Sequence, residues 1–553
     1  AVRLTIADLL GLDVQQEAAP TRYRLNFIKV LHHALGEIEK AWQTKAIQKL
    51  SLQPSNPKVK SRAEAQLAFC IDTRSELIRR HVEACGNYET YGYAGFFGIA
   101  MDYEAPFSGL NRKSCPPIVD SAYKVTEQHR EKTQQVVSTL KLKHEQTEFK
   151  NYFLSRMKNI LPSAFGFVEG AGLAYGFQLL KRTFGSGKPK SSPTPVVENV
   201  CDTEMHHTGT KQELPAEEQA QIVKSAFALT GWSNFAPLVV FAGHGSHTAN
   251  NPFASSLDCG ACAASPGRHN ARMIAKMANS KVVQKVLKEQ HAITIPEDTL
   301  FLGAEHNTTT DDITLFDADI PSQFKASVNQ LKENLKQAQK TATAERLGQT
   351  SSVEKAYKKS TDWSETRPEW GLAKNAGFII GSRTLTQDYN LEGECFLHSY
   401  DWETDTNGEA LNAILNGPMV VTQWINNHYY FSTVENSSYG SGSKITHNVV
   451  GKFGVVQGNG GDLKSGLPLQ SVKASDEESY HQPQRLSVFI HAPQDRLDQL
   501  LKANPHLKQL IENNWIHLLI IDPMHTNTVL RYTQDFKWES LELETTSKTN
   551  VLA

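Results

Sequence analysis

Ala68-Phe69-Cys70-Ile71-Asp72-Thr73-Arg74-Ser75-Glu76 is the stretch that decides the fold. It begins as an apolar run and ends with a thiol, a carboxylate and a guanidinium at alternate positions. A second apolar run, at 237–243, leads into His244 in the same manner. Short apolar runs bounded by turn signals are typical of buried parallel strands. Because sites in open α/β sheets form at the carboxyl ends of the strands, we expect these polar side chains to meet there.

The segments around the two runs predict an α/β fold. A strand at 65–71 followed by an amphipathic helix at 75–84 has the order of a βα unit. The Gly-, Tyr- and Phe-rich segment 88–103 is interpreted as a packed loop near the site. Helices are predicted at 121–160, 165–182, 268–278 and 323–347, and further strands at 299–304, 378–380, 419–421, 486–490 and 517–521.

These elements divide the chain into three predicted regions. Residues 1–60 form a helical N-terminal segment, interpreted as the remnant of a longer N-terminal region. Residues 61–311 hold the parallel-sheet core, interrupted by a large insertion at about 86–230. Residues 312–553 form an α+β C-terminal region. The chain does not begin with Met, which suggests a fragment.

Composition excludes several classes of protein. Fifty-seven Lys and Arg against 59 Asp and Glu give a formal charge of -2, so no basic field favours nucleic acid. No run approaches the ~20 apolar residues of a membrane-spanning helix, so we expect no span in this chain. Seven cysteines without small-domain spacing favour a reducing compartment. The N-terminus lacks the basic start and apolar core of a signal peptide.

Four residues form a candidate metal site. Cys70, Cys259, His244 and Asp72 offer two thiolates, an imidazole and a carboxylate, a mixture that zinc accepts in tetrahedral geometry. The Cys-x-Asp spacing lets both side chains bracket one point if the strand breaks there. Arg74 could pair with Asp72 through two hydrogen bonds and compete with the metal for the carboxylate. A site with an exchangeable fourth ligand is catalytic in type rather than structural.

Simpler interpretations of these residues stay open. A buried cysteine usually behaves as a small hydrophobe, and a histidine after a strand is more often a capping or core residue than a ligand. Cys259-x-x-Cys262 alone suggests a zinc knuckle or a redox pair, but no second such pair occurs. His247, His306 and Asp311 are candidate proton shuttles or supporting groups, against the alternative of ordinary loop hydrogen bonding.

Two resemblances sharpen this hypothesis. Cys70-x-Asp72-x-Arg74 and Gly243-His244 followed by Cys259-Gly260 resemble the zinc site of β-carbonic anhydrases, which use Cys, His, Cys and a displaceable Asp held by an Arg. Those enzymes place His and the second Cys two residues apart, and their first Cys is much closer to the His than the 174 residues seen here. Longer stretches, at 69–76, 243–262, 306–311 and 440–451, resemble the DabA family over most of the chain. Members of that family are longer at the N-terminus.

The second resemblance implies a function. It implies a subunit of an energy-coupled inorganic carbon uptake complex, peripheral at the cytoplasmic face of the cell inner membrane. The partner would be DabB, a membrane protein related to cation-translocating antiporter subunits. Zn²⁺ would be bound by Cys70, Asp72, His244 and Cys259, with Asp72 and Arg74 as the catalytic pair, and CO2 would be hydrated to bicarbonate. An uncoupled zinc enzyme, either a free carbonic anhydrase or a hydrolase, and a non-catalytic scaffold stabilised by zinc are the alternatives.

Overall fold

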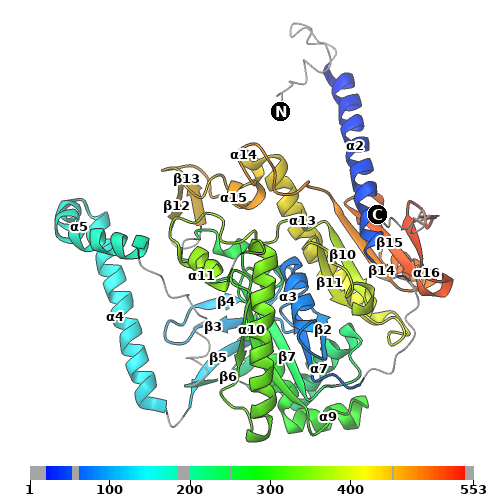
Figure 1. Cartoon of the computed structure of the whole chain (residues 1–553), viewed down its shortest axis with the longest axis horizontal. Coiled ribbons are helices and arrows are strands. Elements are labelled where there is room, and N and C mark those ends of the chain that lie inside the picture. Colours follow the sequence, from blue (N-terminus) through cyan, green and yellow to red (C-terminus); the bar gives the residue numbers. More distant parts are fainter. Residues whose placement is uncertain are drawn as a thin grey trace.

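Two sheets that meet at their edge strands organise the protein (Figure 1). The computed structural model describes residues 20–541 apart from 51, 53–60, 131–132, 185–199, 211, 250, 351 and 451–453. The first sheet has the strand order β2 (Tyr88–Gly92), β1 (Ala65–Phe69), β7 (Leu238–Gly245), β8 (Leu300–Asn307) and β9 (Asp312–Phe316). All pairs are parallel except the last, so the predicted parallel sheet is confirmed.

Helices cover both faces of the first sheet. One face packs against α3 (Thr73–Glu83) and α10 (Lys325–Leu347), and the other against α7 (Ala216–Thr230), α8 (Arg268–Asn279) and α9 (Lys281–His291). Along β7, Val240 belongs to the core on the first face and Phe241 to the core on the second. A strand buried on both faces is apolar at every position, which is why continuous apolar runs predicted these strands.

The second sheet carries most of the C-terminal region. Its order is β11 (Cys395–Ser399), β10 (Gly377–Gly381), β14 (Leu486–His491), β15 (Ile516–Asp522), β16 (Thr528–Tyr532) and β17 (Trp538–Ser540). The first four strands are parallel, and β16 and β17 are antiparallel. The helices here include α12 (Glu409–Asn416), α13 (Pro418–Val434), α16 (Gln494–Ala503) and α17 (Pro505–Glu512). Because parallel strands need long crossover connections, this region is mixed α/β rather than the α+β region expected from sequence.

The N-terminal helix belongs to the second sheet. Helix α2 (Pro20–Gln48) places Ala46 and Ile47 against Ile379 and Phe489. This confirms a helix within the predicted N-terminal segment, although residues 1–19, 51 and 53–60 of that segment lie outside the described residues. The domain boundaries near 60 and 311 remain predictions.

The insertion in the first sheet differs from expectation. The segment 88–103, predicted as a loop, contains β2 of the first sheet and most of β3 (Met101–Glu104). Strand β5 (Tyr123–His129) lies at the start of the segment predicted as a helix. Strands β3 and β5 form a separate sheet with β4 (Asn111–Lys113) and β6 (Cys201–His207). Only Val125 is fully buried among the seven residues of β5, so its sequence carries little of the period-two pattern. Helices α4 (Gln134–Asn159) and α5 (Leu161–Phe184) follow as a hairpin.

A strand predicted at 419–421 is also wrong. These residues lie in the first turn of α13, where Pro418 stands at a position that suits the start of a helix. Two adjacent valines favoured a strand locally, but the helix continues for 17 residues. The remaining elements are α11 (Val353–Thr361), α14 (Asn436–Tyr439), α15 (Leu469–Val472), β12 (His447–Val450) and β13 (Gly454–Gln457).

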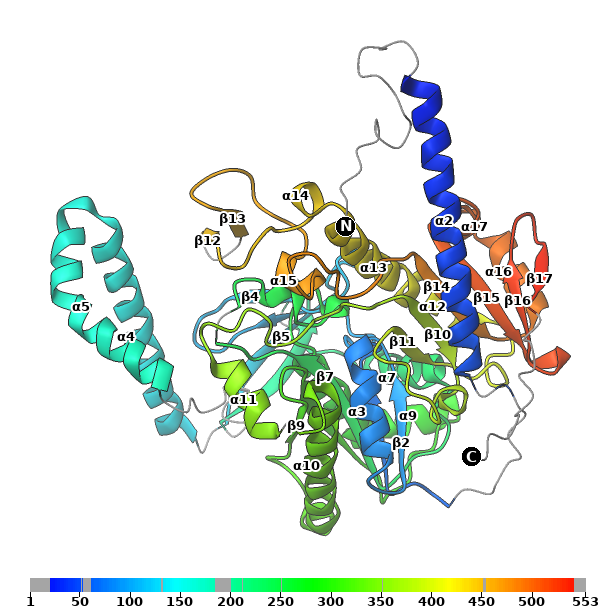
Figure 2. The ribbon, with the colours of Figure 1, turned by 45° about the horizontal axis from the view of Figure 1, so that its top comes forward.

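The two sheets are joined next to the carboxyl ends of β1 and β2. The Leu397 amide donates to the Ile71 carbonyl over 3.2 Å, and the Gly92 amide donates to Ser399 Oγ over 2.9 Å. Figure 2 shows β2 and β11 close to each other in a second orientation. The carboxyl edge of the first sheet is therefore covered by the second. Within the described ranges, no helix has both the length and the apolar character that crossing a bilayer requires.

Candidate metal centre

Three segments distant in sequence deliver the predicted residues. Cys70 directly follows β1, His244 is the next-to-last residue of β7, and Cys259 precedes a short 3-10 turn at Gly260–Cys262. The loop that carries Cys259 folds back onto β7, since the Gly267 amide donates to the His244 carbonyl over 2.9 Å. The parallel strands β1 and β7 pair side by side, so their carboxyl ends bring Cys70 and His244 together.

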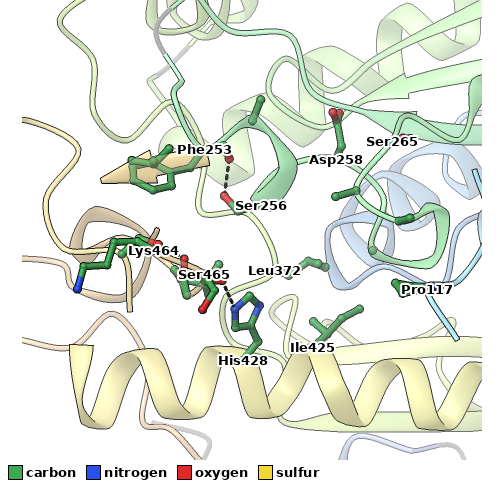
Figure 3. A pocket seen from close by; sticks show the side chains of 18 of the residues that line it. Pro117, Phe253, Ser256, Asp258, Ser265, Leu372, Ile425, His428, Lys464 and Ser465 are labelled. Carbon is green, nitrogen blue, oxygen red and sulfur yellow. Dashed lines mark hydrogen bonds between the residues drawn. The ribbon is translucent and has the colours of Figure 1, made fainter. Parts of the chain in front are cut away.

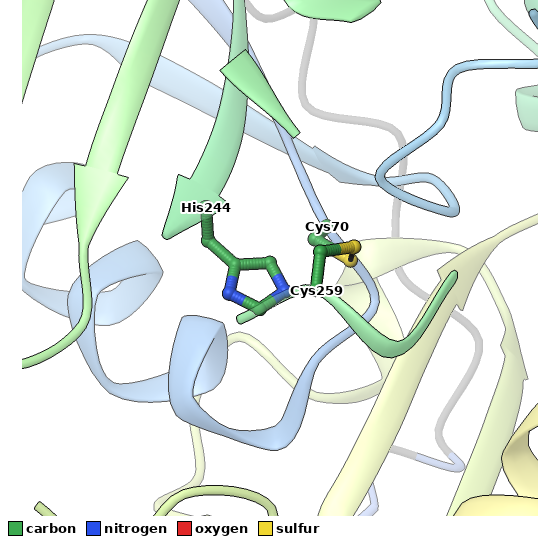
Figure 4. Close-up of side chains that lie close together, drawn as sticks. All are labelled: Cys70, His244 and Cys259. Atoms are coloured by element: carbon green, nitrogen blue, oxygen red, sulfur yellow. Dashed lines mark hydrogen bonds between the residues drawn. The ribbon is translucent and has the colours of Figure 1, made fainter. Parts of the chain in front are cut away.

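The three side chains converge on one point (Figure 4). One ligand atom from each of Cys70, His244 and Cys259 lies within 4.8 Å of the others. The two sulfur atoms are 3.8 Å apart, which is far longer than a disulfide bond of about 2.05 Å. All three residues are buried, with His244 and Cys259 at 0% exposure. The structure thus assembles three of the four predicted ligands.

The chemistry of this cluster fits a metal ion. Neither Nδ1 nor Nε2 of His244 has a hydrogen-bond partner, although the side chain is fully buried. A buried polar atom without a partner costs free energy, and coordination would satisfy one of the nitrogens. Burial raises the pKa of the Cys70 and Cys259 thiols well above the usual value. A bound cation would compensate for the cost of burying their thiolates.

Glycines allow the backbone to approach the cluster. A Cβ at Gly95 would lie 2.8 Å from Cys259 Sγ and 2.9 Å from Cys70 Sγ. A Cβ at Gly243 would lie 2.2 Å from the Gly267 carbonyl, where the loop crosses β7. Contacts this short do not occur for real Cβ atoms, so both positions need glycine for the cluster to form as it does.

Asp72 lies beside the cluster but is held by Arg74. Asp72 caps helix α3, its Oδ1 accepting from the Arg74 amide over 2.8 Å. Arg74 Nε donates to Oδ1 and Nη2 to Oδ2, each over 2.9 Å. The second oxygen, Oδ2, is also 3.4 Å from His244 Nε2. Burial opposes ionisation of Asp72, but Arg74 and His244 outweigh it and hold the pKa below its usual range.

Arg74 extends this arrangement to the C-terminal region. Its Nη1 donates to the Leu257 carbonyl over 2.8 Å and lies 3.2 Å from Glu369 Oε2. Glu369 in turn accepts from the Thr308 hydroxyl over 2.9 Å. Arg74 and Glu369 line a cavity of about 270 Å³, together with Thr308. Arg74 therefore borders this cavity, whereas Cys70, His244 and Cys259 do not line it.

The other candidate residues take different places. Cys262 is buried but stands outside the three-residue group. His306 pairs with His244 across β7 and β8, and burial lowers its pKa to about 4. Both ring nitrogens of His306 lack partners. His247 Nε2 is 3.1 Å from Glu305, and Asp311 is paired with Arg346 at 2.9 Å. Among these candidates, His306 is the one that lies opposite a cluster residue on a neighbouring strand with both ring nitrogens unpartnered.

A second cavity, of about 810 Å³, lies on the outer side of the loop that carries Cys259 (Figure 3). Asp258 and Gly260, the neighbours of Cys259, line it with Ile425 and His428 of α13. Burial raises the pKa of Asp258 to about 6. The three clustered side chains do not line this cavity, so it contacts the loop and not the ligand atoms.

Sequence patterns did not reveal two residues of this site. Glu369 lies in a segment between α11 and β10 without periodicity or motif, so nothing marked it before the fold was known. Gly95 lies in the Gly-rich segment predicted to pack near the site, and that composition was the available signal.

Comparison with known proteins identifies the family of this chain. A family model described as "Probable inorganic carbon transporter subunit DabA" matches residues 1–516. Proteins with that description include one from Haloarcula marismortui, 46% identical over 530 residues that cover 90% of this chain and 64% of that protein. One from Salinibacter ruber is 43% identical, covering 98% and 70%, and one from Legionella pneumophila strain Lens is 40% identical, covering 95% and 70%.

The match leaves part of those relatives uncovered. The chain spans 64% of the length of the Haloarcula protein. No solved structure matches the chain. The family model nevertheless covers most of the sequence, including every residue of the cluster, and the chain belongs to the DabA family of inorganic carbon transporter subunits.

Proposed function

We propose that this chain is the zinc-binding subunit of an inorganic carbon uptake complex and hydrates CO2 to bicarbonate. The observation that carries the proposal is the buried Cys70–His244–Cys259 cluster with an arginine-held aspartate next to it. Two sulfurs and an imidazole suit zinc, and this set with a displaceable Asp resembles the β-carbonic anhydrase site. We infer that the sheet around it is carbonic-anhydrase-like.

The residues around the cluster suit this chemistry. A zinc ion held there would supply the positive charge that lets water ionise near neutral pH. Asp72 is ionised and fixed by Arg74, so its carboxylate can accept a hydrogen bond from the attacking water and orient it. His306 is neutral and offers one donor and one acceptor beside His244. Release of Asp72 from Arg74 would free the carboxylate to occupy the fourth ligand position and switch hydration off.

Coupling to a membrane partner completes the proposal. The family description names a transporter subunit, which implies a second subunit. We propose a DabB-like, antiporter-related partner, with this chain peripheral at the cytoplasmic face of the inner membrane. Cation flow through the partner would act on the Asp72–Arg74 pair, so that hydration runs only when driven. Arg74 is suited to this role because it also contacts Glu369 of the C-terminal region.

Metal content tests the site. Zinc is measured by mass spectrometry on the purified chain and on four variants: His244→Ala, Cys259→Ser, Cys262→Ser and Asp72→Ala. We expect about one zinc per wild-type chain, lost in the first two variants and kept in the last two. Cys262→Ser is the matched control, since it removes a buried thiol outside the cluster. A wild-type chain without zinc, or equal zinc in all variants, would contradict the site.

Activity separates the proposal from its alternatives. CO2 hydration is followed by ¹⁸O exchange for the zinc-loaded chain alone and with the membrane partner in energised vesicles. Hydration that requires the energised partner supports the coupled subunit. Equal hydration by the chain alone would favour a free carbonic anhydrase. Zinc without hydration in either preparation would favour a scaffold, an outcome consistent with the burial of Cys70 and Cys259 in the core shared with the second sheet.

A further inference from the structure

The hairpin of α4 and α5 stands apart from the rest of the protein. Figures 1 and 2 show the two helices projecting together away from the sheets. Helix α4 has one buried side chain, Val137, and none of the described side chains of α5 is buried. The two helices, 26 and 24 residues long, would each reach about 36 Å or more at 1.5 Å per residue. Such a projection needs a covering surface or a functional reason.

The hairpin gathers exposed apolar side chains. With the residue that joins its helices, it contributes 15 of the 34 large apolar side chains exposed in the described part of the chain. The most exposed include Leu173 at 90%, Phe184 at 83%, Leu161 at 80% and Phe165 at 77%. From 161 to 180, α5 carries a single charged residue, Glu169. An apolar surface of this density is not stable in water without something to cover it.

The charge of the hairpin indicates what covers it. Residues 134–184 contain seven Lys and Arg against three Glu, a formal charge of +4, whereas the whole chain carries -2. Most of the basic residues lie on α4, and Arg156 and Lys158 stand in its last turn, next to the apolar start of α5. Apolar side chains flanked by Lys and Arg are typical of helices that lie in the interface of a bilayer with anionic lipids.

We propose that the α4–α5 hairpin binds the surface of an anionic lipid bilayer, with α5 entering the headgroup region and the basic residues of α4 contacting lipid phosphates. This inference rests on the proposed function and extends it, because it names the surface by which a peripheral subunit would attach to the membrane. None of the described side chains of α5 is buried, and most of them are exposed. Lipid matches such a surface without requiring shape complementarity. The binding would hold the metal centre near the membrane.

Vesicle binding by the full chain tests the proposal. Co-sedimentation is measured with vesicles of phosphatidylcholine alone and with about 30% phosphatidylglycerol added, at low and high salt. The apolar variant combines Leu161→Gln, Phe165→Gln and Leu173→Gln, and the basic variant combines Arg156→Gln and Lys158→Gln. A matched control combines Val282→Gln and Lys288→Gln on α9, where Val282 is 62% exposed.

We expect wild type and control to bind anionic vesicles, with affinity falling at high salt. We expect each hairpin variant to bind about tenfold more weakly or worse. The proposal would be overturned if wild type bound neither kind of vesicle, or if the hairpin variants bound like wild type. Binding only to vesicles that contain the membrane partner would also overturn it and would indicate a protein contact instead. Zinc content checks folding of each variant. Vesicle binding by a chain that holds no zinc would refute the proposed function and leave this inference standing.

Discussion

Arg74 holds both carboxylate oxygens of Asp72, with Nε 2.9 Å from Oδ1 and Nη2 2.9 Å from Oδ2. The same guanidinium reaches Glu369, which lies 295 residues further along the chain. Asp72 therefore lies between two residues: His244 of the cluster on one side, and Arg74, which contacts the C-terminal region, on the other. Glu369 thus contacts the residue that holds the carboxylate next to the candidate metal site.

Removal of the Arg74 side chain should destabilise the protein strongly. Arg74→Ala leaves Asp72 and Glu369 as buried carboxylates that have lost a common partner, and breaking a buried pair in this way costs about 3–5 kcal/mol. Denaturant unfolding at pH 7 measures the loss. Arg74→Lys is the control, because it keeps the charge but not the paired hydrogen bonds. Its free energy of unfolding should fall between those of wild type and Arg74→Ala. A loss below about 1 kcal/mol for Arg74→Ala would show that the pairing contributes little.

Much of this site was predictable because its chemistry lies at strand ends. The apolar runs before Cys70 and His244 predicted buried parallel strands, and parallel strands place their carboxyl ends together. The C-terminal half of the site was not predictable in the same way. Glu369 reaches Arg74 only because the second sheet joins the first next to Ile71, a contact made by backbone atoms that leave no pattern in the sequence.

The errors in secondary structure have a similar cause. Strand β5 has a single buried residue, Val125, and belongs to a small sheet, so partner strands distant in sequence determine its conformation. The valines after Pro418 favour a strand locally, but the packing of α13 overrides this preference. Local preference predicted most of the strands that are buried on both faces, but it missed β11, whose five residues are all buried, and it failed at β5, where only Val125 is buried.

A methyl group at Gly95 should disrupt metal binding. Gly95→Ala would place Cβ within 3 Å of both cluster sulfurs, so the loop or the thiols must move. We expect zinc affinity, measured by competition with a chelator, to fall about tenfold or more, as for changes next to a metal site. Gly36→Ala on α2 is the control, because no atom lies within 4 Å of the added carbon. Unchanged affinity in Gly95→Ala would mean that the sulfurs have room to retreat.

Glu39 should make stability depend on pH in the acid range. Its pKa is lowered to about 2, because hydrogen bonds from His517 and Arg485 outweigh the effect of burial. A lowered pKa in the folded state gives stability that is present above pH 4.5 and is lost as the pH falls toward 2. The full shift corresponds to about 3 kcal/mol.

The comparison of Glu39→Gln with Glu37→Gln isolates this effect. Glu37 lies on the same helix but is exposed and forms a salt bridge to Lys40. The free energies of unfolding at pH 7 and at pH 3 should differ less for Glu39→Gln than for wild type. For Glu37→Gln, the difference between the two pH values should match that of wild type. Parallel pH profiles for wild type and Glu39→Gln would show that helix α2 does not depend on this ion pair for its contact with the second sheet.

Replacement of His306 should separate catalysis from folding. The imidazole is fully buried, and neither nitrogen has a hydrogen-bond partner, so His306→Phe removes no hydrogen bond and keeps an aromatic ring next to Phe69. We expect a change in unfolding free energy within about 1 kcal/mol and unchanged zinc content. If His306 hydrogen-bonds to substrate or transfers a proton beside His244, CO2 hydration by the coupled complex should fall about a hundredfold. His398→Phe is the matched control, since His398 is also buried and neutral, but its Nδ1 donates a hydrogen bond to the Ser399 carbonyl in the second sheet. This control should lose up to about 1 kcal/mol of stability and keep its hydration rate per zinc. Equal rates in wild type and His306→Phe would identify His306 as a core residue and leave Asp72 as the polar group that orients the water.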